Sequence, residues 1–333
     1  MIRTIEDAVE LVQTVCRQPG NRQFVMETRR AVRDAGVVAA VANRDTPALY
    51  RWLMDGFSYQ GISDAVALGY IGRHGNATWE GIEQALANSK SGCPKLISFQ
   101  TYRGCGYRKT ARTCQNPDEL SGCPVPSLPL RKGSLNEQAF SLFLFIRDHC
   151  QGDLVGFIDD LIEEAGSAPV GDQREFLLGE FAMVYGISEK LLSMMLAMLL
   201  MAGDPDRAKW IVVGRSMVAI DTLVHNFLHR TGILSAYGFE HRYGPRCFDR
   251  RGCSGVVYDL ANRIDAREFN RLFPKTFPRF VQHAIWSFCA EMRQDICNGR
   301  RIDDGRACQA VDCPVGNRCS RFPLRVKAVK GRG

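Results

Sequence analysis

The sequence lacks several features that would assign it to a common class of protein. Residues 1–22 mix acidic, basic and apolar residues and contain no apolar stretch of the kind found in an export signal. The longest apolar run, residues 191–202, is too short for a membrane-spanning helix, which needs ~20 residues. Glycine-rich phosphate loops and flavin or nicotinamide fingerprints are also missing. We therefore expect a cytoplasmic protein without a membrane partner or a nucleotide cofactor.

Apart from its cysteines, the composition is ordinary. The chain has 333 residues and a hydrophobic fraction of 45%, enough for two domains or for one domain with large additions. Its net charge of +7 is compatible with a nucleic-acid partner but does not demonstrate one. Thirteen cysteines without an export signal argue against disulfides, because intracellular thiols stay reduced and clustered ones are commonly metal ligands.

Apolar residues at helical spacing dominate the chain, so we predict a mostly α fold. We find no internal repeat and no convincing pair of strands in the sequence. Changes in composition divide the chain into six segments. These are a helical N-terminal region (residues 1–92), a cysteine-bearing loop (93–134), a second helical region (135–234), an irregular basic insertion (235–270), a helix with a further cysteine loop (271–323) and a basic tail (324–333).

The most informative motif is a group of four cysteines near the end of the chain. Its members are Cys297, Cys308, Cys313 and Cys319. Thiolates bind zinc and iron–sulfur clusters. Zinc sites commonly contain a tight C-x2-C turn, which is missing here, whereas a larger [4Fe-4S] cluster can be held by a longer loop. The spacing therefore favours a cluster over zinc, and four independent thiols are the remaining alternative.

A second group of four cysteines lies in the loop-rich segment 93–134. Its members are Cys93, Cys105, Cys114 and Cys123. Zinc or a second cluster would order a segment that has no core of its own, although four unrelated thiols would give the same pattern. Basic and aromatic residues between these cysteines, including Tyr107 and Arg108, are candidate contacts for phosphates and bases, and otherwise form a solvated loop.

The remaining cysteines have less specific surroundings. Cys16, Cys150 and Cys289 are isolated, and we expect them to be buried apolar residues. Cys247 and Cys253 form a loose pair that could pin a basic loop.

Two further pairs of residues allow more than one interpretation. Arg246 and Arg250 lie in the same basic loop, where they would either line a groove for DNA or be solvated. His225 and His229 are one helical turn apart and could bind a metal or contact DNA, but core or solvent-facing positions are the simpler interpretation.

Asp221 is the candidate catalytic acid. It precedes Thr222 and an apolar run, an arrangement that is also that of an ordinary helix N-cap. A fixed carboxylate can stabilise the positive charge that develops on a sugar when its N-glycosidic bond breaks, and it can orient or activate water. The pattern around Asp221 is therefore compatible with both roles.

The residues before the last cysteine group resemble a known family. Residues 283–297, which contain Trp286 and end at Cys297, look like the helix that precedes the iron–sulfur loop of endonuclease III-like helix-hairpin-helix (HhH-GPD) DNA glycosylases. The gap between Cys313 and Cys319 matches the final gap of that loop, whereas the first two gaps are longer than usual.

The resemblance extends to Asp221, because residues 218–224 are similar to the V-D-T-h-V segment that carries the family's catalytic aspartate. It covers about residues 135–320 as separate motifs. It implies an HhH-GPD-type helical barrel and an iron–sulfur cluster loop, with an extra N-terminal helical region. Cys297, Cys308, Cys313 and Cys319 would hold a chiefly structural [4Fe-4S] cluster. The implied reaction is excision of a modified or mismatched base from duplex DNA by base flipping, with Asp221 as catalytic carboxylate.

Two departures from the family pattern shape the expected activity. In place of the DNA-binding hairpin, residues 201–209 contain Gly203, a candidate phosphate contact, but no second glycine. No lysine occupies the family's Schiff-base position, and Lys209 is offset from it, so we expect a monofunctional glycosylase that uses water. Arg230 is a further candidate DNA contact. The protein would act as a monomer on duplex DNA and be associated with the nucleoid.

Two other functions are compatible with the same motifs. The first is a non-catalytic DNA-binding iron–sulfur protein on a glycosylase scaffold. The second is a redox-sensing or electron-transfer protein with two clusters, which predicts reversible cluster reduction and no affinity for duplex DNA.

Overall fold

The computed structural model describes residues 2–90, 92–108, 110–115, 121–298 and 302–324. These residues form sixteen α-helices and no strand, and one isolated antiparallel bridge joins Arg108 to Thr113. The predicted mostly α fold is therefore confirmed. Within this part of the chain, no helix has both the length and the apolar character that crossing a membrane requires.

The chain divides into two compact units whose limits differ from those of the predicted segments. The first unit combines Met1–Thr28 with Arg215–Gly333, and the second is Arg29–Gly214. Two helices, α2 (Phe24–Asp34) and α13 (Ala208–Ser216), run across the limits between the units. Composition and periodicity predict which segments are helical, but they do not show which distant helices pack together.

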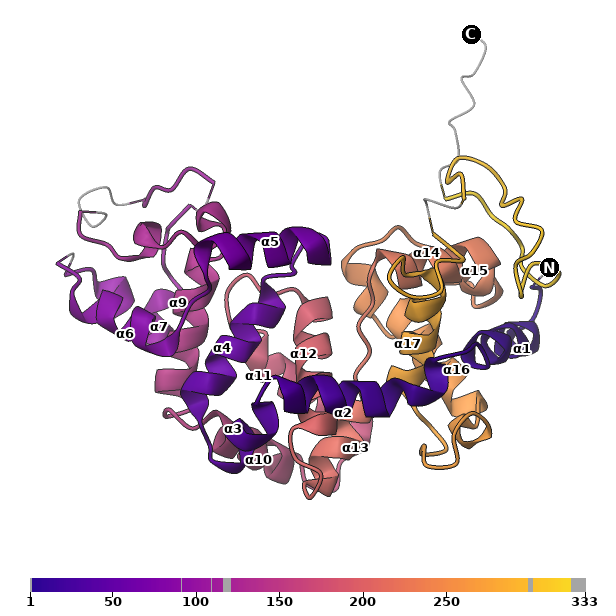
Figure 1. The fold of residues 1–333 in the computed structure, drawn as a ribbon, viewed down its shortest axis with the longest axis horizontal. Helices are drawn as coiled ribbons and strands as arrows, with labels where there is room; N and C mark the ends of the chain where they lie inside the picture. Colours follow the sequence, from indigo (N-terminus) through magenta and orange to yellow (C-terminus); the bar gives the residue numbers. More distant parts are fainter. Residues whose placement is uncertain (1, 91, 109, 116–120, 299–301, 325–333) are drawn as a thin grey trace, which may run out of the picture. The chain divides into compact units, whose positions relative to one another are not determined.

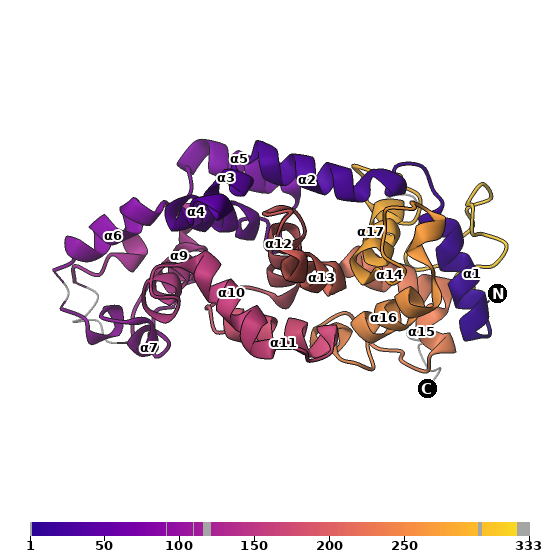
Figure 2. The same ribbon diagram turned by 90° about the horizontal axis from the view of Figure 1, so that it is seen from below.

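The first unit is built around one buried helix. Ten of the twelve residues of α17 are buried, and this helix packs against α1, α14 and α16 (Figures 1 and 2). Proline in its first turn suits the start of a helix, where a backbone N–H would have no partner. The helices that belong wholly to this unit are α1 (Ile5–Cys16), α14 (Thr222–Thr231), α15 (Ile233–Ala236), α16 (Cys253–Arg263) and α17 (Pro278–Cys289).

Helix α16 corrects the expectation that residues 235–270 are irregular. Its apolar residues Val256, Val257 and Leu260 are fully buried, and the helix packs against α17. The arginine-rich loop before it conceals this short apolar pattern in the sequence. Of the predicted basic tail, only Leu324 is among the described residues, and the rest lies outside them.

The second unit places helix α4 among α3, α6, α9, α10 and α12. The start of this helix follows from local chemistry, because Asp45 caps it and Pro47 lies in its first turn. A Cβ atom at Gly56 would collide with the side chain of Met195, so glycine allows α4 and α12 to approach closely. The helices wholly in this unit are α3 (Val37–Ala42), α4 (Thr46–Phe57), α5 (Asp64–His74), α6 (Trp79–Ala87), α7 (Phe99–Tyr102), α9 (Asn136–Leu144), α10 (Leu154–Ala165), α11 (Val170–Phe181) and α12 (Glu189–Ala202).

Candidate metal centres and acid site

Asp221 is the N-cap residue of α14. Its Oδ1 atom accepts a hydrogen bond of 2.9 Å from the backbone N–H of Val224, so the capping role predicted for this residue is confirmed. The side chain is partly exposed, which leaves the carboxylate accessible from solvent.

Two groups from other elements of the first unit lie within electrostatic reach of Asp221. Burial lowers the pKa of Arg279, on α17, to about 10, and the charge of Asp221 opposes this shift. Burial raises the pKa of Tyr243, and the charge of Asp221 adds to that increase. The Tyr243 side chain is 43% exposed. A buried cation and a surface phenol therefore both feel the charge of Asp221, a combination that no motif in the sequence predicted.

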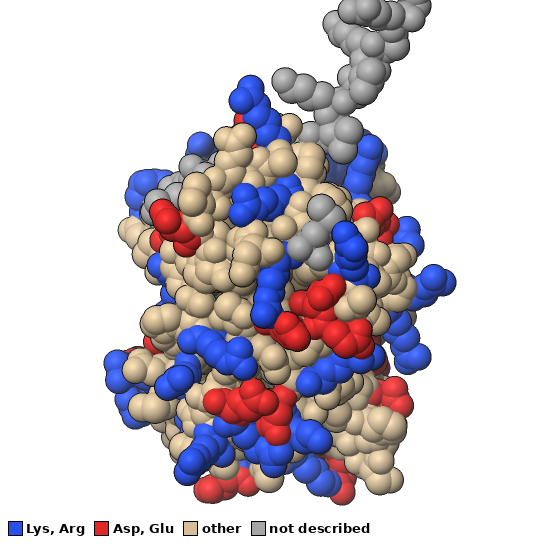
Figure 3. Space-filling view, turned by 90° about the vertical axis from the view of Figure 1, so that its right-hand side faces the viewer, with Lys and Arg blue, Asp and Glu red and all other residues tan. Residues whose placement is uncertain are grey.

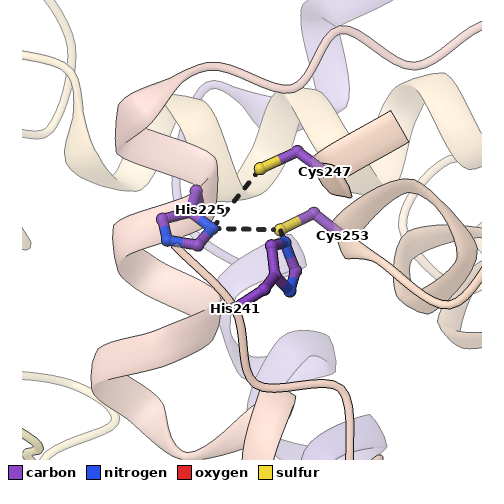
Figure 4. Close-up of side chains that lie close together, drawn as sticks. All are labelled: His225, His241, Cys247 and Cys253. Atoms are coloured by element: carbon purple, nitrogen blue, oxygen red, sulfur yellow. Dashed lines mark hydrogen bonds between the residues drawn. The ribbon is translucent and has the colours of Figure 1, made fainter. Parts of the chain in front are cut away.

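Four metal-ligating side chains converge next to this acid. His225, His241, Cys247 and Cys253 are close enough that their ligand atoms all lie within 4.8 Å of one another. The Nδ1 atom of His225 lies 3.3 Å from Sγ of Cys253 and 3.6 Å from Sγ of Cys247 (Figure 4). The Nε2 atom of His241 lies 3.4 Å from Sγ of Cys253. We name these four residues the Cys2His2 group.

Three of the four residues of the Cys2His2 group are buried, and His241 is partly exposed. Cys247 and Cys253 are fully buried, and His225 is also buried. The pKa of the Cys247 thiol is lowered, mainly by a hydrogen bond with Cys253. A hydrogen bond with His225 lowers the pKa of Cys247 further. The arrangement therefore favours a thiolate, which is the form of cysteine that binds metals.

Two glycines explain how the chain turns tightly enough to form this group. The 3-10 helix η6 (Pro245–Phe248) carries Cys247, and α16 begins at Cys253. A Cβ atom at Gly252 would collide with the carbonyl oxygen of Arg246, and one at Gly255 would collide with that of Arg250. The backbone can approach this closely only because both positions lack a side chain.

The sequence contains a signal for the Cys2His2 group, although it is weaker than that of the two cysteine groups. By themselves, Cys247 and Cys253 indicate only a pair of cysteines that holds a loop in place. His225 lies one helical turn from His229, and the sequence therefore groups these two histidines with each other rather than with the cysteines. His241, Cys247 and Cys253 are, however, evenly spaced along the chain with five residues in each gap. The group omits His229, which lies one turn further along α14.

The predicted C-terminal cysteines lie in one region of the first unit. Burial raises the pKa of the Cys319 thiol to about 11, and the thiols of the other three add to the shift. Backbone N–H groups donate to two of the sulfurs, from Val315 to Cys313 and from Arg321 to Cys319, the latter at 3.3 Å. Cys297 also interacts with the buried Cys289 thiol, which was not predicted to take part.

Arg230 is adjacent to this cysteine loop and is only 2% exposed. Its Nη2 atom donates a hydrogen bond of 2.6 Å to Oδ1 of Asp304, and its charge lowers the pKa of Cys297. Its Nη1 atom has no hydrogen-bond partner among the described residues. The guanidinium is therefore turned toward the loop rather than toward solvent, and we correct its assignment as a DNA contact.

The four cysteines of segment 93–134 line one cavity in the second unit. Cys93, Cys105, Cys114 and Cys123 all contribute to its wall, and its volume is about 230 Å³. Burial raises the pKa of the Cys105 thiol to about 11, with added contributions from Cys114 and Cys123. Thiols spread over thirty-one residues of sequence thus line one cavity.

The other predicted DNA contacts differ in exposure. Arg108, Arg246 and Arg250 are exposed. Tyr107 is 5% exposed and forms part of the wall of the cysteine cavity, so its ring is not available for stacking on a base.

Gly203 does not offer a backbone amide to a phosphate. It ends helix α12, and its N–H donates a hydrogen bond of 2.7 Å to the carbonyl of Leu199. Asp204, the next residue, accepts hydrogen bonds from the backbone of Asp206 and from the side chain of Arg207. The turn is thus stabilised from within, and this corrects the expectation for Gly203.

All thirteen cysteines lie within the described residues and carry thiols rather than disulfides. Cys16, Cys150 and Cys289 are buried, as predicted. Comparison of the chain with protein-family models, with curated proteins and with solved structures finds no match.

Proposed function

We propose that this protein is a monofunctional DNA glycosylase that removes a modified or mismatched base from duplex DNA. The observation that carries the proposal is the position of Asp221, a partly exposed carboxylate at the N-terminus of α14 with Arg279 and Tyr243 nearby. The resemblance of residues 218–224 and 283–297 to endonuclease III-like glycosylases supports it.

In this proposal the Asp221 carboxylate acts on the sugar of a flipped nucleotide. As the N-glycosidic bond lengthens, positive charge develops on the sugar, and the fixed negative charge of Asp221 stabilises it. The same carboxylate orients the water that completes hydrolysis. Its hydrogen bond from Val224 keeps the side chain in one position, so little reorganisation is needed during the reaction.

Water is the proposed nucleophile because the one lysine near the family's position is engaged elsewhere. The Nζ atom of Lys209 pairs with Oε2 of Glu163 at 2.6 Å on the surface of the second unit. A lysine that is exposed and ion-paired with an acid is a poor candidate for a Schiff-base nucleophile. The proposal therefore includes base release without strand cleavage.

The chemistry of the C-terminal loop supports the [4Fe-4S] cluster that the resemblance implies. Cys297, Cys308, Cys313 and Cys319 would be its ligands, and backbone N–H groups directed at sulfurs are suited to thiolates. A buried arginine with an unused donor is suited to an anionic group. When bound, the cluster would cross-link residues of the loop to one another, and the loop is held against α14 by the hydrogen bonds of Ser320 and Phe322 to its last turn.

The cavity formed by Cys93, Cys105, Cys114 and Cys123 supports a second metal centre in the same protein. Its four thiols suit zinc or a second cluster, because both are held by four cysteines. Such a centre would order residues 93–134, where the helical elements are short.

DNA affinity would depend on individual arginines. Arg246 and Arg250 are exposed on the loop that carries Cys247, and they are the candidate phosphate contacts that remain in the first unit. On the face drawn in Figure 3, Lys and Arg side chains are interspersed with groups of Asp and Glu. A duplex at that face would meet a mixed surface and few of its phosphates would be neutralised, so its affinity should depend only weakly on salt.

The test compares wild type with Asp221→Asn on a panel of duplexes that each contain one damaged or mismatched base. Asparagine preserves the helix cap but removes the charge, so base release should fall by about 100-fold or more while duplex binding is retained. Asp45→Asn, the same change at the N-cap of α4, is the matched control and should leave base release unchanged.

The outcomes separate the three candidate functions. Duplex binding without base release by the wild type would favour a non-catalytic DNA-binding protein. Reversible reduction of a cluster without duplex affinity would favour an electron-transfer protein. Equal base release by wild type and Asp221→Asn would remove Asp221 from the mechanism.

A further inference from the structure

We propose that His225, His241, Cys247 and Cys253 hold one structural zinc ion that fastens the basic loop to the helix of Asp221. This site is separate from both groups of four cysteines. Two imidazoles and two thiols are a common donor set for zinc, and four protein ligands leave no open coordination position. The site is therefore suited to a structural role rather than to catalysis.

The distances within the group match one tetrahedral ion. Zinc binds sulfur at about 2.3 Å and nitrogen at about 2.0–2.1 Å, so tetrahedral geometry separates a sulfur from a nitrogen ligand by about 3.5 Å. Three of the four sulfur–nitrogen distances in the group are 3.3, 3.4 and 3.6 Å. A two-iron cluster with the same donors would hold its histidines and cysteines on different iron atoms and thus further apart.

Burial also supports an ion at this place. Cys247 and Cys253 have no exposed surface, and His225 is 6% exposed. Two buried thiols beside two imidazoles gain only weak hydrogen bonds, because sulfur is a poor donor and acceptor. A zinc ion replaces these contacts with four strong bonds, and structural zinc contributes directly to the stability of the fold.

The ligands come from separate parts of the first unit, so the ion acts as a cross-link. His225 lies on α14 one turn after Asp221, whereas Cys253 begins α16 (Figure 4). The loop between them contains Tyr243, whose ring centroid lies 5.7 Å from that of His225. The ion therefore fixes Tyr243 beside Asp221. The zinc site itself does not depend on the proposed function. Only a role of the zinc-bound loop in catalysis at Asp221 rests on it.

The experiment measures the zinc and iron content of the purified full-length protein by mass spectrometry. Cys253→Ser and His241→Gln should each lose one equivalent of zinc relative to wild type and keep the wild-type iron content. His229→Gln is the matched control, because it changes a histidine on the same helix that is outside the Cys2His2 group, and it should keep all its zinc. Wild-type protein without zinc, or unchanged zinc in both ligand variants, would overturn the proposal.

A second measurement decides the matter if the ligand variants do not fold. X-ray absorption at the zinc edge of the wild-type protein should show nitrogen at about 2.0–2.1 Å together with sulfur at about 2.3 Å. A shell of sulfur alone would contradict the proposal, since it would assign the zinc to cysteines only.

Limited digestion with trypsin tests the cross-link itself. Arg246, Arg250 and Arg251 are exposed in the loop, and removal of zinc by a chelator should make the loop at least ten times more sensitive to cleavage at these residues. Unchanged cleavage after zinc has been removed would show that the ion does not hold the loop. None of these assays depends on base release, so the zinc site and the glycosylase proposal can fail separately.

Discussion

Helix α17 carries two ionisable side chains that are largely removed from water, the buried Arg279 and the partly exposed His283. The ring of His283 stacks on that of Phe24, with centroids 4.2 Å apart. Burial lowers the pKa of His283 to about 3, and the charges of Arg279 and Arg293 add to the shift. This histidine is therefore neutral in the folded protein at all but strongly acidic pH.

We expect His283 to make the protein less stable as the pH falls. An unfolded histidine has a pKa of about 6.5, so between that pH and about 3 the unfolded chain binds more protons than the folded one. The stabilising contribution is complete above about pH 6.5 and is lost below it. His283→Phe keeps the stacking and removes the titration, so the loss of unfolding free energy between pH 7 and pH 5 should be smaller by about 2 kcal/mol.

Urea unfolding of both proteins across this pH range checks the prediction. His74→Gln, a change at an exposed histidine, is the control and should follow the wild-type pH profile. Parallel profiles for wild type and His283→Phe would mean that His283 is accessible to protons in the folded state.

At the scale of elements, the C-terminal loop depends on α14 for its position. The backbone N–H of Ser320 donates to the carbonyl of Thr231, and that of Phe322 donates to the carbonyl of Arg230, at 3.0 and 2.9 Å. The side chain of Arg230 adds the buried bond to Asp304. The last carbonyl groups of α14 have no partner within the helix, so they need hydrogen bonds from elsewhere when they are buried. The backbone N–H groups of the loop provide these hydrogen bonds.

Asp304→Asn should destabilise the first unit. It leaves the Arg230 guanidinium buried without its charge partner, and such losses cost about 3–5 kcal/mol. Because Asp304 is 30% exposed, we expect the lower end of this range. Thermal and denaturant unfolding measure the effect.

The neighbouring Asp303 provides the comparison. It pairs with Arg306 on the surface, where both side chains are more than 60% exposed. Asp303→Asn should therefore change the unfolding free energy by about 1 kcal/mol or less. A similar loss in both variants would show that the buried pair has no special role.

At the scale of the whole molecule, the candidate metal centres are distributed over the two units. The Cys2His2 group and the C-terminal cysteines belong to the first unit, and the cysteine cavity belongs to the second. Packing contacts are concentrated within each unit, so loss of one centre should loosen mainly the unit that contains it.

Hydrogen exchange with single cysteine variants tests this separation. Cys313→Ser should lower the iron content and speed exchange several-fold in residues 290–324 and in α14, while the second unit keeps its protection. Cys105→Ser should lower the metal content and speed exchange in residues 93–134 and in α9. Cys150→Ser, at a buried cysteine outside both groups, should keep the full metal content. Exchange that rises equally in both units would contradict the separation.

The sequence was sufficient for features that depend on neighbouring residues. Helical spacing predicted the fold class, and the cap at Asp221 followed from local hydrogen-bonding chemistry. The C-terminal cysteines were recognised as a group because they are close in sequence.

Features that depend on packing between distant residues were not predictable in this way. The Cys2His2 group requires α14 to meet the start of α16, and the burial of Arg230 requires the loop to cover that helix. Tyr107 and Gly203 were likewise assigned from composition and motif, whereas their environments are set by the cysteine cavity and by the end of α12. One chain does not contain the pairing information that would reveal such contacts.

The first unit joins α1 to helices that follow the second unit in the chain, whereas the second unit is one continuous stretch. During synthesis the second unit can therefore fold as soon as it leaves the ribosome, since domains generally fold in the order in which they emerge. Helix α1 must wait, with its apolar side uncovered, until α17 has been made. The nascent protein consequently depends on protection of this helix for as long as the whole second unit and the helices after it are being translated.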